Sequence, residues 1–173
     1  MRNVEIKARV DDLATLRARV ERLADRPVER IRQEDVFFFT ARGRLKLRIL
    51  APDSGQLVYY EREDSAGPRP SYYLVYPTAQ PLLLRALLSA ALGVRGVVRK
   101  ERHLFWAGDT RIHLDHVEGL GDFVELEVVL EEGQPVAEGK ARADELMAAL
   151  GIRADQLEEG AYIDLLERSQ GAG

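Results

Sequence analysis

The sequence predicts an α+β fold in a single domain over residues 1–173, built around a sheet whose strands each carry charge on one face. Three observations predict it. Short segments alternate charged and aliphatic residues with a period of two, which is the pattern of a strand. Other segments space their apolar residues with the period of a helix. The length of 173 residues allows one domain with a sizeable core but not two full domains.

Four strand segments place charge on one face and aliphatic residues on the other. In the first of them, Glu5 and Lys7 alternate with Val4, Ile6 and Ala8. The charged rows are Glu5, Lys7 and Arg9; Arg44, Lys46 and Arg48; Arg111, His113 and Asp115; and Glu125 with Glu127. A sheet that closes on itself with these rows inward would bring cations and carboxylates into one lumen, which suits a polyanion with its metal ions. An open α+β sandwich with the charged rows in water is the alternative.

The remaining strands follow from alternation and from turn-forming residues between them. The segments 51–55 and 66–70 are rich in proline, glycine, serine and aspartate, and we expect them to be loops. The strands after the first are expected at residues 35–39, 43–50, 56–62, 72–76, 97–106, 110–117 and 123–130.

Four helices are expected around this sheet. The first follows the opening strand, is capped by Asp11 or Asp12, and has an apolar stripe made of Leu13, Leu16, Val20 and Leu23. The others are expected at residues 78–92, 135–150 and 155–167, and Gly93 and Gly151 end the first two of these.

The composition excludes several classes of protein. A net charge of −4 argues against a general nucleic-acid binder, and the absence of cysteine excludes disulfides and thiolate chemistry. The three histidines are too few and too spread for a typical zinc site, and we interpret His113 as a hydrogen-bonded structural residue. Residues 1–10 lack a signal-peptide core, and the apolar run 82–92 is too short to span a bilayer. We therefore expect a cytoplasmic protein without a membrane partner.

The bases on the inward faces come from at least five strands. Arginine binds phosphate oxygens through two parallel hydrogen bonds, and lysine adds a point charge. Cations spread over several strands fit an extended chain of phosphates better than a single phosphate. The alternative is an ordinary solvated face. These bases are Lys7, Lys46, Arg48, Arg62, Lys100, Arg102 and Arg111.

The acids on the inward faces suggest a metal site. Clustered carboxylates repel one another unless a cation lies among them, and Mg²⁺ and Mn²⁺ take oxygen ligands. We therefore expect Mg²⁺ or Mn²⁺ to bind there, with simple ion pairs to the neighbouring bases as the alternative. The acids are Glu5, Asp115, Glu125 and Glu127.

The N-terminal segment Asn3-Val-Glu5-Ile-Lys7 resembles the E-x-E-x-K signature of the CYTH family, the triphosphate tunnel metalloenzymes. This family includes class IV adenylyl cyclases, thiamine triphosphatases and inorganic triphosphatases. The resemblance continues in order along nearly the whole chain. Its further segments are residues 33–38, 45–48, 99–102, 111–115, 117–121, 125–127 and 161–165.

The resemblance implies a closed eight-stranded antiparallel β tunnel, or barrel, with helices packed outside. It implies a triphosphate-containing small molecule as the partner, held by the seven bases. It also implies that Glu5, Lys7, Glu125 and Glu127 act in catalysis, and that Glu5, Glu125 and Glu127, with Asp115, bind the metal. The chain departs from the signature at Asn3, where the family has a first glutamate. The protein is expected to be a monomer or a homodimer.

The expected activity is metal-dependent hydrolysis of a triphosphate, because hydrolysis requires only a water molecule and no oriented ribose. Class IV adenylyl cyclase activity, which makes cyclic AMP and pyrophosphate from ATP, is the alternative that the N-terminal similarity favours. Asn3 motivates a third reading, in which the tunnel binds a polyphosphate or nucleotide without turning it over.

Overall fold

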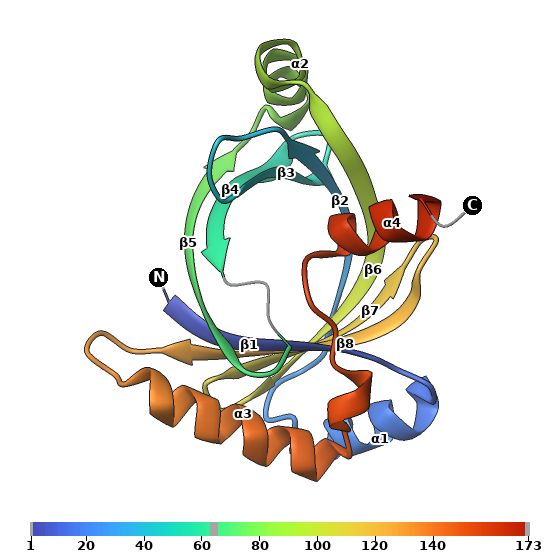
Figure 1. Ribbon diagram of the computed structural model, residues 1–173, viewed down its shortest axis with the longest axis vertical. Helices are drawn as coiled ribbons and strands as arrows, with labels where there is room; N and C mark the ends of the chain where they lie inside the picture. Colours follow the sequence, from blue (N-terminus) through green and yellow to red (C-terminus); the bar gives the residue numbers. More distant parts are fainter. Residues whose placement is uncertain (1, 63–65, 172–173) are drawn as a thin grey trace.

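Eight antiparallel strands close into a barrel in the computed structural model, which describes residues 2–62 and 66–171 (Figure 1). The order around the barrel is β1-β5-β4-β3-β2-β6-β7-β8, so that β1 joins the meander β2–β5 to the meander β6–β8. The predicted closed tunnel is confirmed, and the open sandwich is excluded. The strands are β1 (Arg2–Arg9), β2 (Glu29–Phe38), β3 (Arg44–Ala51), β4 (Ser54–Arg62), β5 (Arg69–Thr78), β6 (Val94–Ala107), β7 (Thr110–Val117) and β8 (Gly121–Leu130).

The helices cover the outside of the barrel and one of its ends (Figure 1). Leu16 and Val20 of α1, together with Leu146 and Leu150 of α3, pack with the aliphatic outer faces of β1, β6, β7 and β8. Asp12 caps α1 by accepting a hydrogen bond from Thr15 N–H at 3.0 Å. The helices are α1 (Leu13–Leu23), α2 (Pro81–Leu92), α3 (Val136–Leu150) and α4 (Tyr162–Gly171). Among the described residues, no helix has the length and apolar content that a membrane span requires.

Five strands begin earlier than predicted: β4 (Ser54) and β8 (Gly121) by two residues, β5 (Arg69) and β6 (Val94) by three, and β2 (Glu29) by six. The first residues of β2 and β5 do not form an aliphatic row that would have marked them. β2 begins at Glu29 instead of residue 35, and its first half pairs with β6 from Leu104 onward. β5 begins at Arg69, inside the segment 66–70 that its turn-forming residues predict to be a loop.

Two helix predictions differ from the structure. The helix predicted at 155–167 is misplaced, and the predicted start of the helix at 78–92 is three residues before the observed start. Ala154–Gln156 form a 3₁₀ turn, and α4 begins only at Tyr162, after a left-handed Gly160 with φ +80°. Asp164 accepts a hydrogen bond from Ala161 N–H at 2.6 Å and so stabilises this new start. α2 begins at Pro81 because β5 continues to Thr78.

The strand registers arrange the inward side chains in rings. Each ring is traced from strand to strand: from Glu5 we take the residue paired with it on the neighbouring strand and then move two residues along that strand toward the end of the barrel where α4 lies. Repeating this step around all eight strands leads back to Glu5, so the residues reached in this way lie at one level of the tilted barrel. This central ring consists of Glu5, Glu125, Asp115, Lys100, Asp35, Lys46, Tyr60 and Ser71.

Two further rings follow on the side away from α4. They are obtained from the same registers by moving two residues along every strand. The second ring consists of Asn3, Glu127, His113, Arg102, Gln33, Arg48, Val58 and Tyr73. The end ring contains Arg111, Leu104, Ile31, Leu50, Gln56 and Val75.

Candidate functional site

The barrel encloses a cavity of about 470 Å³ that is lined by inward-facing side chains. Asp115 does not line this cavity, and the side chain of Arg62 lies outside the part of the chain that the structure describes. The other predicted site residues all line it: Glu5, Lys7, Lys46, Arg48, Lys100, Arg102, Arg111, Glu125 and Glu127.

One side of the cavity is a cation wall, made of Lys46 and Arg48 on β3 and Lys100 and Arg102 on β6. Asp35 on β2, between these strands, holds three of the four. Its carboxylate accepts two hydrogen bonds from Arg48 at 2.8 and 2.9 Å, one from Lys46 at 2.9 Å and one from Lys100 at 3.2 Å. The wall is therefore fixed in position before any anion binds.

The charges of this wall shift one another's ionisation. Burial alone would raise the pKa of Asp35, but Arg48, Lys100 and Lys46 hold it well below its usual range. Burial and the adjacent Arg48 lower the pKa of Lys46 to about 7. Burial also lowers the pKa of Lys100. An anion entering the cavity would relieve the repulsion among these bases.

A carboxylate wall, made of Glu5 on β1 with Glu125 and Glu127 on β8, lies across the barrel from β3. In the register of β1 and β8, Glu5 is opposite Glu127 and Lys7 is opposite Glu125. Glu125 pairs with Lys7 at 3.2 Å and with Arg102 at 2.8 Å. Burial would raise the pKa of Glu125, yet Lys7 and Arg102 hold it well below its usual range, so that it is ionised at neutral pH.

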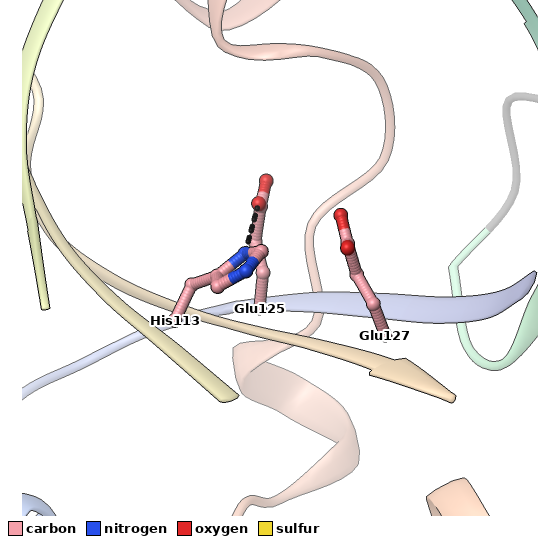
Figure 2. Close-up of side chains that lie close together, drawn as sticks. All are labelled: His113, Glu125 and Glu127. Atoms are coloured by element: carbon pink, nitrogen blue, oxygen red, sulfur yellow. Dashed lines mark hydrogen bonds and ion pairs between the residues drawn. The ribbon is translucent and has the colours of Figure 1, made fainter. Parts of the chain in front are cut away.

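His113 joins two of these acids in a group that could hold a metal ion (Figure 2). His113 extends from β7, beside Glu125 and Glu127 of β8, and one ligand atom from each of the three lies within 4.8 Å of the others. His113 Nδ1 is 3.5 Å from the nearer oxygen of Glu125. Two ionised carboxylates and an imidazole suit a divalent cation, so the side chains present fit the metal that the resemblance implies.

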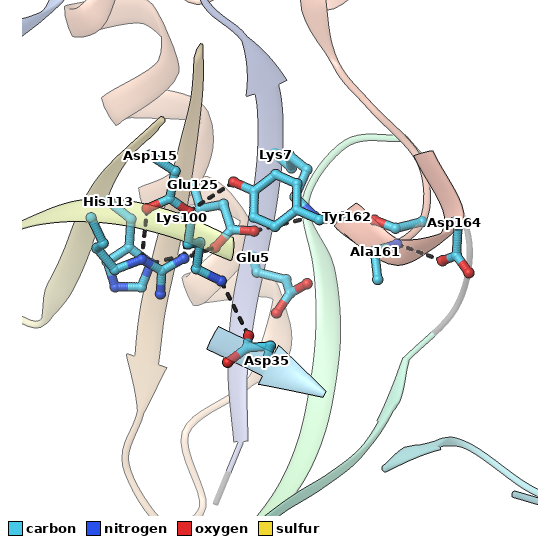
Figure 3. Close-up of polar contacts among 12 residues, drawn as sticks. Glu5, Lys7, Asp35, Lys100, His113, Asp115, Glu125, Ala161, Tyr162 and Asp164 are labelled. Atoms are coloured by element: carbon cyan, nitrogen blue, oxygen red, sulfur yellow. Dashed lines mark hydrogen bonds and ion pairs between the residues drawn. The ribbon is translucent and has the colours of Figure 1, made fainter. Parts of the chain in front are cut away.

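Arg102 lines the cavity and is held there by Asp115, which in turn accepts a hydrogen bond from Tyr162; Figure 3 shows Asp115 beside Tyr162. It donates two hydrogen bonds to the fully buried Asp115, at 2.7 and 2.6 Å, and Tyr162 donates a third to that carboxylate at 2.8 Å. Burial would raise the pKa of Asp115, but Arg102 lowers it. These contacts favour a positioning role for Asp115; its binding to a metal stays a prediction.

The first residues of α4 close one end of the cavity. Tyr162 and Ala161 line it, and the Tyr162 ring packs edge-on against Phe123. Lys7 donates a hydrogen bond to the carbonyl of Gly160 at 3.2 Å and lies 4.0 Å from the centre of the Tyr162 ring. Lys7 is therefore held between this segment and the carboxylate wall.

Three side chains of this site were not predicted. Asp35 shares the inward parity of Phe37, but the expected strand began at Asp35, and the other inward residues of β2, Ile31, Gln33 and Phe37, form no charged row that would have marked it. Tyr162 was missed because the last helix was placed too early, and no local signal indicates that its end enters a barrel. His113, interpreted from sequence as structural, lies within the candidate metal group.

Comparison with protein families identifies a match over most of the chain. The model of the CYTH domain matches residues 1–162. Adenylate cyclase CyaB from Aeromonas hydrophila is 31% identical over 86 residues, which are 49% of this chain and 45% of that protein. The match to this curated relative thus spans just under half of its length.

Solved structures share the fold over nearly their full length. The PH1012 protein from Pyrococcus horikoshii OT3 has a TM-score of 0.84 and 26% identity, covering 95% of this chain and 99% of that one. A Hippeastrum protein described as having a dominant triphosphatase activity has a TM-score of 0.67 and 16% identity, covering 96% of each chain. With a family model that matches residues 1–162, this chain belongs to the CYTH domain family.

Proposed function

We propose that this protein binds a triphosphate in the barrel cavity and hydrolyses it with the help of a divalent metal ion. One observation carries the proposal: a single cavity is lined both by the four fixed cations of the cation wall and by the carboxylate wall, and the two walls meet where Arg102 pairs with Glu125. A linear triphosphate carries several charges along its length, and the cation wall extends over the central and second rings. The family membership and the neighbour with a triphosphatase activity support this choice.

The cation wall would hold the phosphates. Arg48 and Arg102 each retain guanidinium N–H groups beyond those that bind their carboxylate partners, and these would donate to phosphate oxygens, while Lys46 and Lys100 add point charge in the central ring. Because Asp35 and Asp115 already orient these bases, little reorganisation would accompany the increase of charge on the phosphate oxygens. Removing one such group typically costs on the order of 10²–10³ in rate.

The carboxylate wall would hold Mg²⁺ or Mn²⁺ through Glu5, Glu125 and Glu127. Such an ion, when bound, supplies positive charge to a phosphate oxygen and lowers the pKa of a bound water. Lys7 would balance the charge of Glu125 at the end closed by α4. Arg111, which pairs with Glu127 at 2.9 Å, would contact the part of the substrate nearest the end ring.

Adenylyl cyclase activity is the second candidate, and two observations favour it. The curated relative that matches this chain is a cyclase. The end ring is also mainly apolar, because Ile31, Leu50, Val75 and Leu104 line the cavity there beside Gln56. An apolar ring beyond the phosphate-binding bases leaves room for an organic group attached to the triphosphate. Cyclisation would require the ribose hydroxyl to attack the α-phosphate and release pyrophosphate.

Chromatography of the products separates these functions. The protein is incubated with inorganic triphosphate, ATP or thiamine triphosphate, each with Mg²⁺ or Mn²⁺. Phosphate release supports the hydrolase, and cyclic AMP with pyrophosphate supports the cyclase. Tight binding without any product would favour the binding module and contradict both enzymatic proposals.

Matched variants test the assignment of the walls. We expect Glu125→Gln and Glu127→Gln to reduce turnover by on the order of 10²-fold or more, and Arg48→Ala to weaken triphosphate binding. Arg32→Ala is the control, because Arg32 lies on the barrel strand β2 but its side chain points outward and is 89% exposed. Unchanged turnover in both glutamate variants would refute the site.

A further inference from the structure

Two side chains that are not carboxylates, Asn3 and His113, flank Glu127 in the second ring. Asn3 on β1, Glu127 on β8 and His113 on β7 are successive members of this ring, on three neighbouring strands. Since Glu5 is directly opposite Glu127, Asn3 is the diagonal neighbour of Glu127 on the same face. Both Asn3 and His113 line the cavity.

The amide oxygen of Asn3 is available to bind a ligand. The residue is 2% exposed, and its Oδ1 accepts no hydrogen bond from the part of the chain that the structure describes. A buried polar atom without a partner costs about 1–3 kcal/mol, and native structures rarely retain one without a reason. An amide oxygen is a ligand that divalent cations accept in place of a carboxylate.

The imidazole of His113 lies on the other side of Glu127, on β7. It is 4% exposed, and its only hydrogen-bond contact within residues 2–62 and 66–171 is the long one of 3.5 Å to Glu125. The pairs of Glu125 with Lys7 and Arg102 leave lone pairs on both of its oxygens. Figure 2 shows the imidazole and both carboxylates extending to the same side of the sheet. A cation among them would contact one nitrogen and at least two oxygens.

We infer that Asn3 and His113 are ligands of the metal bound by Glu125 and Glu127, and that this mixed nitrogen and oxygen site prefers Mn²⁺ to Mg²⁺. The inference rests on the proposed function for the presence of a metal and adds its ligands and its identity. Mg²⁺ requires a nearly ideal octahedron of oxygen ligands and retains several waters. Imidazole suits later transition ions, and carboxylates suit Mn²⁺ as well as Mg²⁺. Replacing a family glutamate by Asn3 while using His113 lowers the ligand charge, which weakens Mg²⁺ more than Mn²⁺.

Titration of the metal-free protein with Mn²⁺, without substrate, tests the inference. Electron paramagnetic resonance measures free Mn²⁺, competition gives the affinity for Mg²⁺, and electron spin-echo modulation detects a nitrogen bound to Mn²⁺. We expect Mn²⁺ to bind at least about tenfold more tightly than Mg²⁺, with an imidazole nitrogen signal. His113→Gln should remove this signal and lower the affinity for Mn²⁺ about tenfold or more, while the affinity for Mg²⁺ changes less. Asn3→Leu should weaken both ions.

His116→Gln is the matched control. His116 lies on the same strand, faces outward with a side chain that is 68% exposed, and pairs with Asp122. It should leave both affinities and the nitrogen signal unchanged. If His113→Gln lowers the affinities for Mn²⁺ and Mg²⁺ equally, the substitution has damaged the site in general and the inference is overturned. A nitrogen signal that survives the substitution would also overturn it. If triphosphate is hydrolysed but His113→Gln leaves Mn²⁺ binding intact, the inference fails while the proposed function stands. If Mn²⁺ binds through His113 but no triphosphate reacts, the proposed function fails instead.

Discussion

Asp35 shows how a single buried acid can organise a binding wall for anions. Its side chain is 1% exposed and contacts Lys46, Arg48 and Lys100. In the free protein it neutralises part of their charge, and in a complex it would keep the three bases at fixed positions. The free energy that this carboxylate contributes to folding therefore also preorganises the site.

Replacing Asp35 by Asn should be strongly destabilising at neutral pH. Three buried cations would lose their partner, and breaking a buried ion pair typically costs about 3–5 kcal/mol. Because the pKa of Asp35 is depressed in the folded state, its contribution is complete above its unfolded pKa of about 4 and is lost as the pH falls below that value. Urea unfolding at several pH values measures this. The difference between wild type and Asp35→Asn should shrink below pH 4, whereas the exposed Asp155→Asn should unfold at nearly the same urea concentration as wild type.

Lys46 gives the affinity for triphosphate a pH dependence. With a pKa of about 7, its ammonium is charged below pH 7 and increasingly neutral above it, so the free cavity loses positive charge as the pH rises. A bound polyanion favours the charged form, and binding at pH 8 should therefore take up close to one proton. Calorimetry of inorganic triphosphate binding in two buffers of different ionisation enthalpy measures this uptake. Lys46→Arg should reduce it, and a heat that is independent of the buffer in wild type would contradict the assignment.

At the scale of elements, the sequence predicted strands well where charge alternates with aliphatic residues, as in β1, β3, β7 and β8. It failed where both faces are polar. The first half of β2 carries Arg30, Arg32 and Glu34 outward and Gln33 inward, so no aliphatic row indicates a strand. The position of α4 was wrong because it depends on Gly160 and on an apolar barrel end formed by residues far apart in sequence, including Phe37, Val98 and Phe123.

α4 should influence catalysis through one hydroxyl. The Tyr162 hydroxyl donates a hydrogen bond to Asp115, which in turn holds Arg102. Tyr162→Phe keeps the ring against Phe123 and removes only this hydrogen bond, which is worth about 1 kcal/mol. Steady-state kinetics should show a loss in kcat of roughly fivefold with little change in KM, because Arg102 would be less well oriented as charge develops. Tyr76→Phe, at an exposed tyrosine of β5, should have no effect. A decrease in stability with unchanged kcat would assign Tyr162 a purely structural role.

At the scale of the whole molecule, the alternation of residues along each strand predicted which side chains face inward but could not predict which of them contact one another. Lys46 and Lys100 are far apart in sequence, yet both belong to the central ring with Asp35. Their level depends on the registers of all eight strand pairs, which long-range packing determines and no local pattern records. The residues alone allowed either a closed tunnel or an open sheet, and only the resemblance to a family predicted the closed tunnel.

Because ligands would bridge two walls that belong to different strands, triphosphate and metal together should stabilise the entire barrel. At a hundred times the dissociation constant, a ligand adds about 2.7 kcal/mol to the free energy of unfolding, which is roughly 5–10 °C in Tm for a chain of this size. Differential scanning calorimetry with inorganic triphosphate, Mn²⁺ or both measures the shift. Glu127→Gln should lose the Tm shift that depends on Mn²⁺ but keep the shift caused by triphosphate alone. Arg48→Ala should lose the shift caused by triphosphate but keep the shift caused by Mn²⁺. Identical shifts in the two variants would mean that the ligands bind outside the cavity, and both walls would then have to be reassigned.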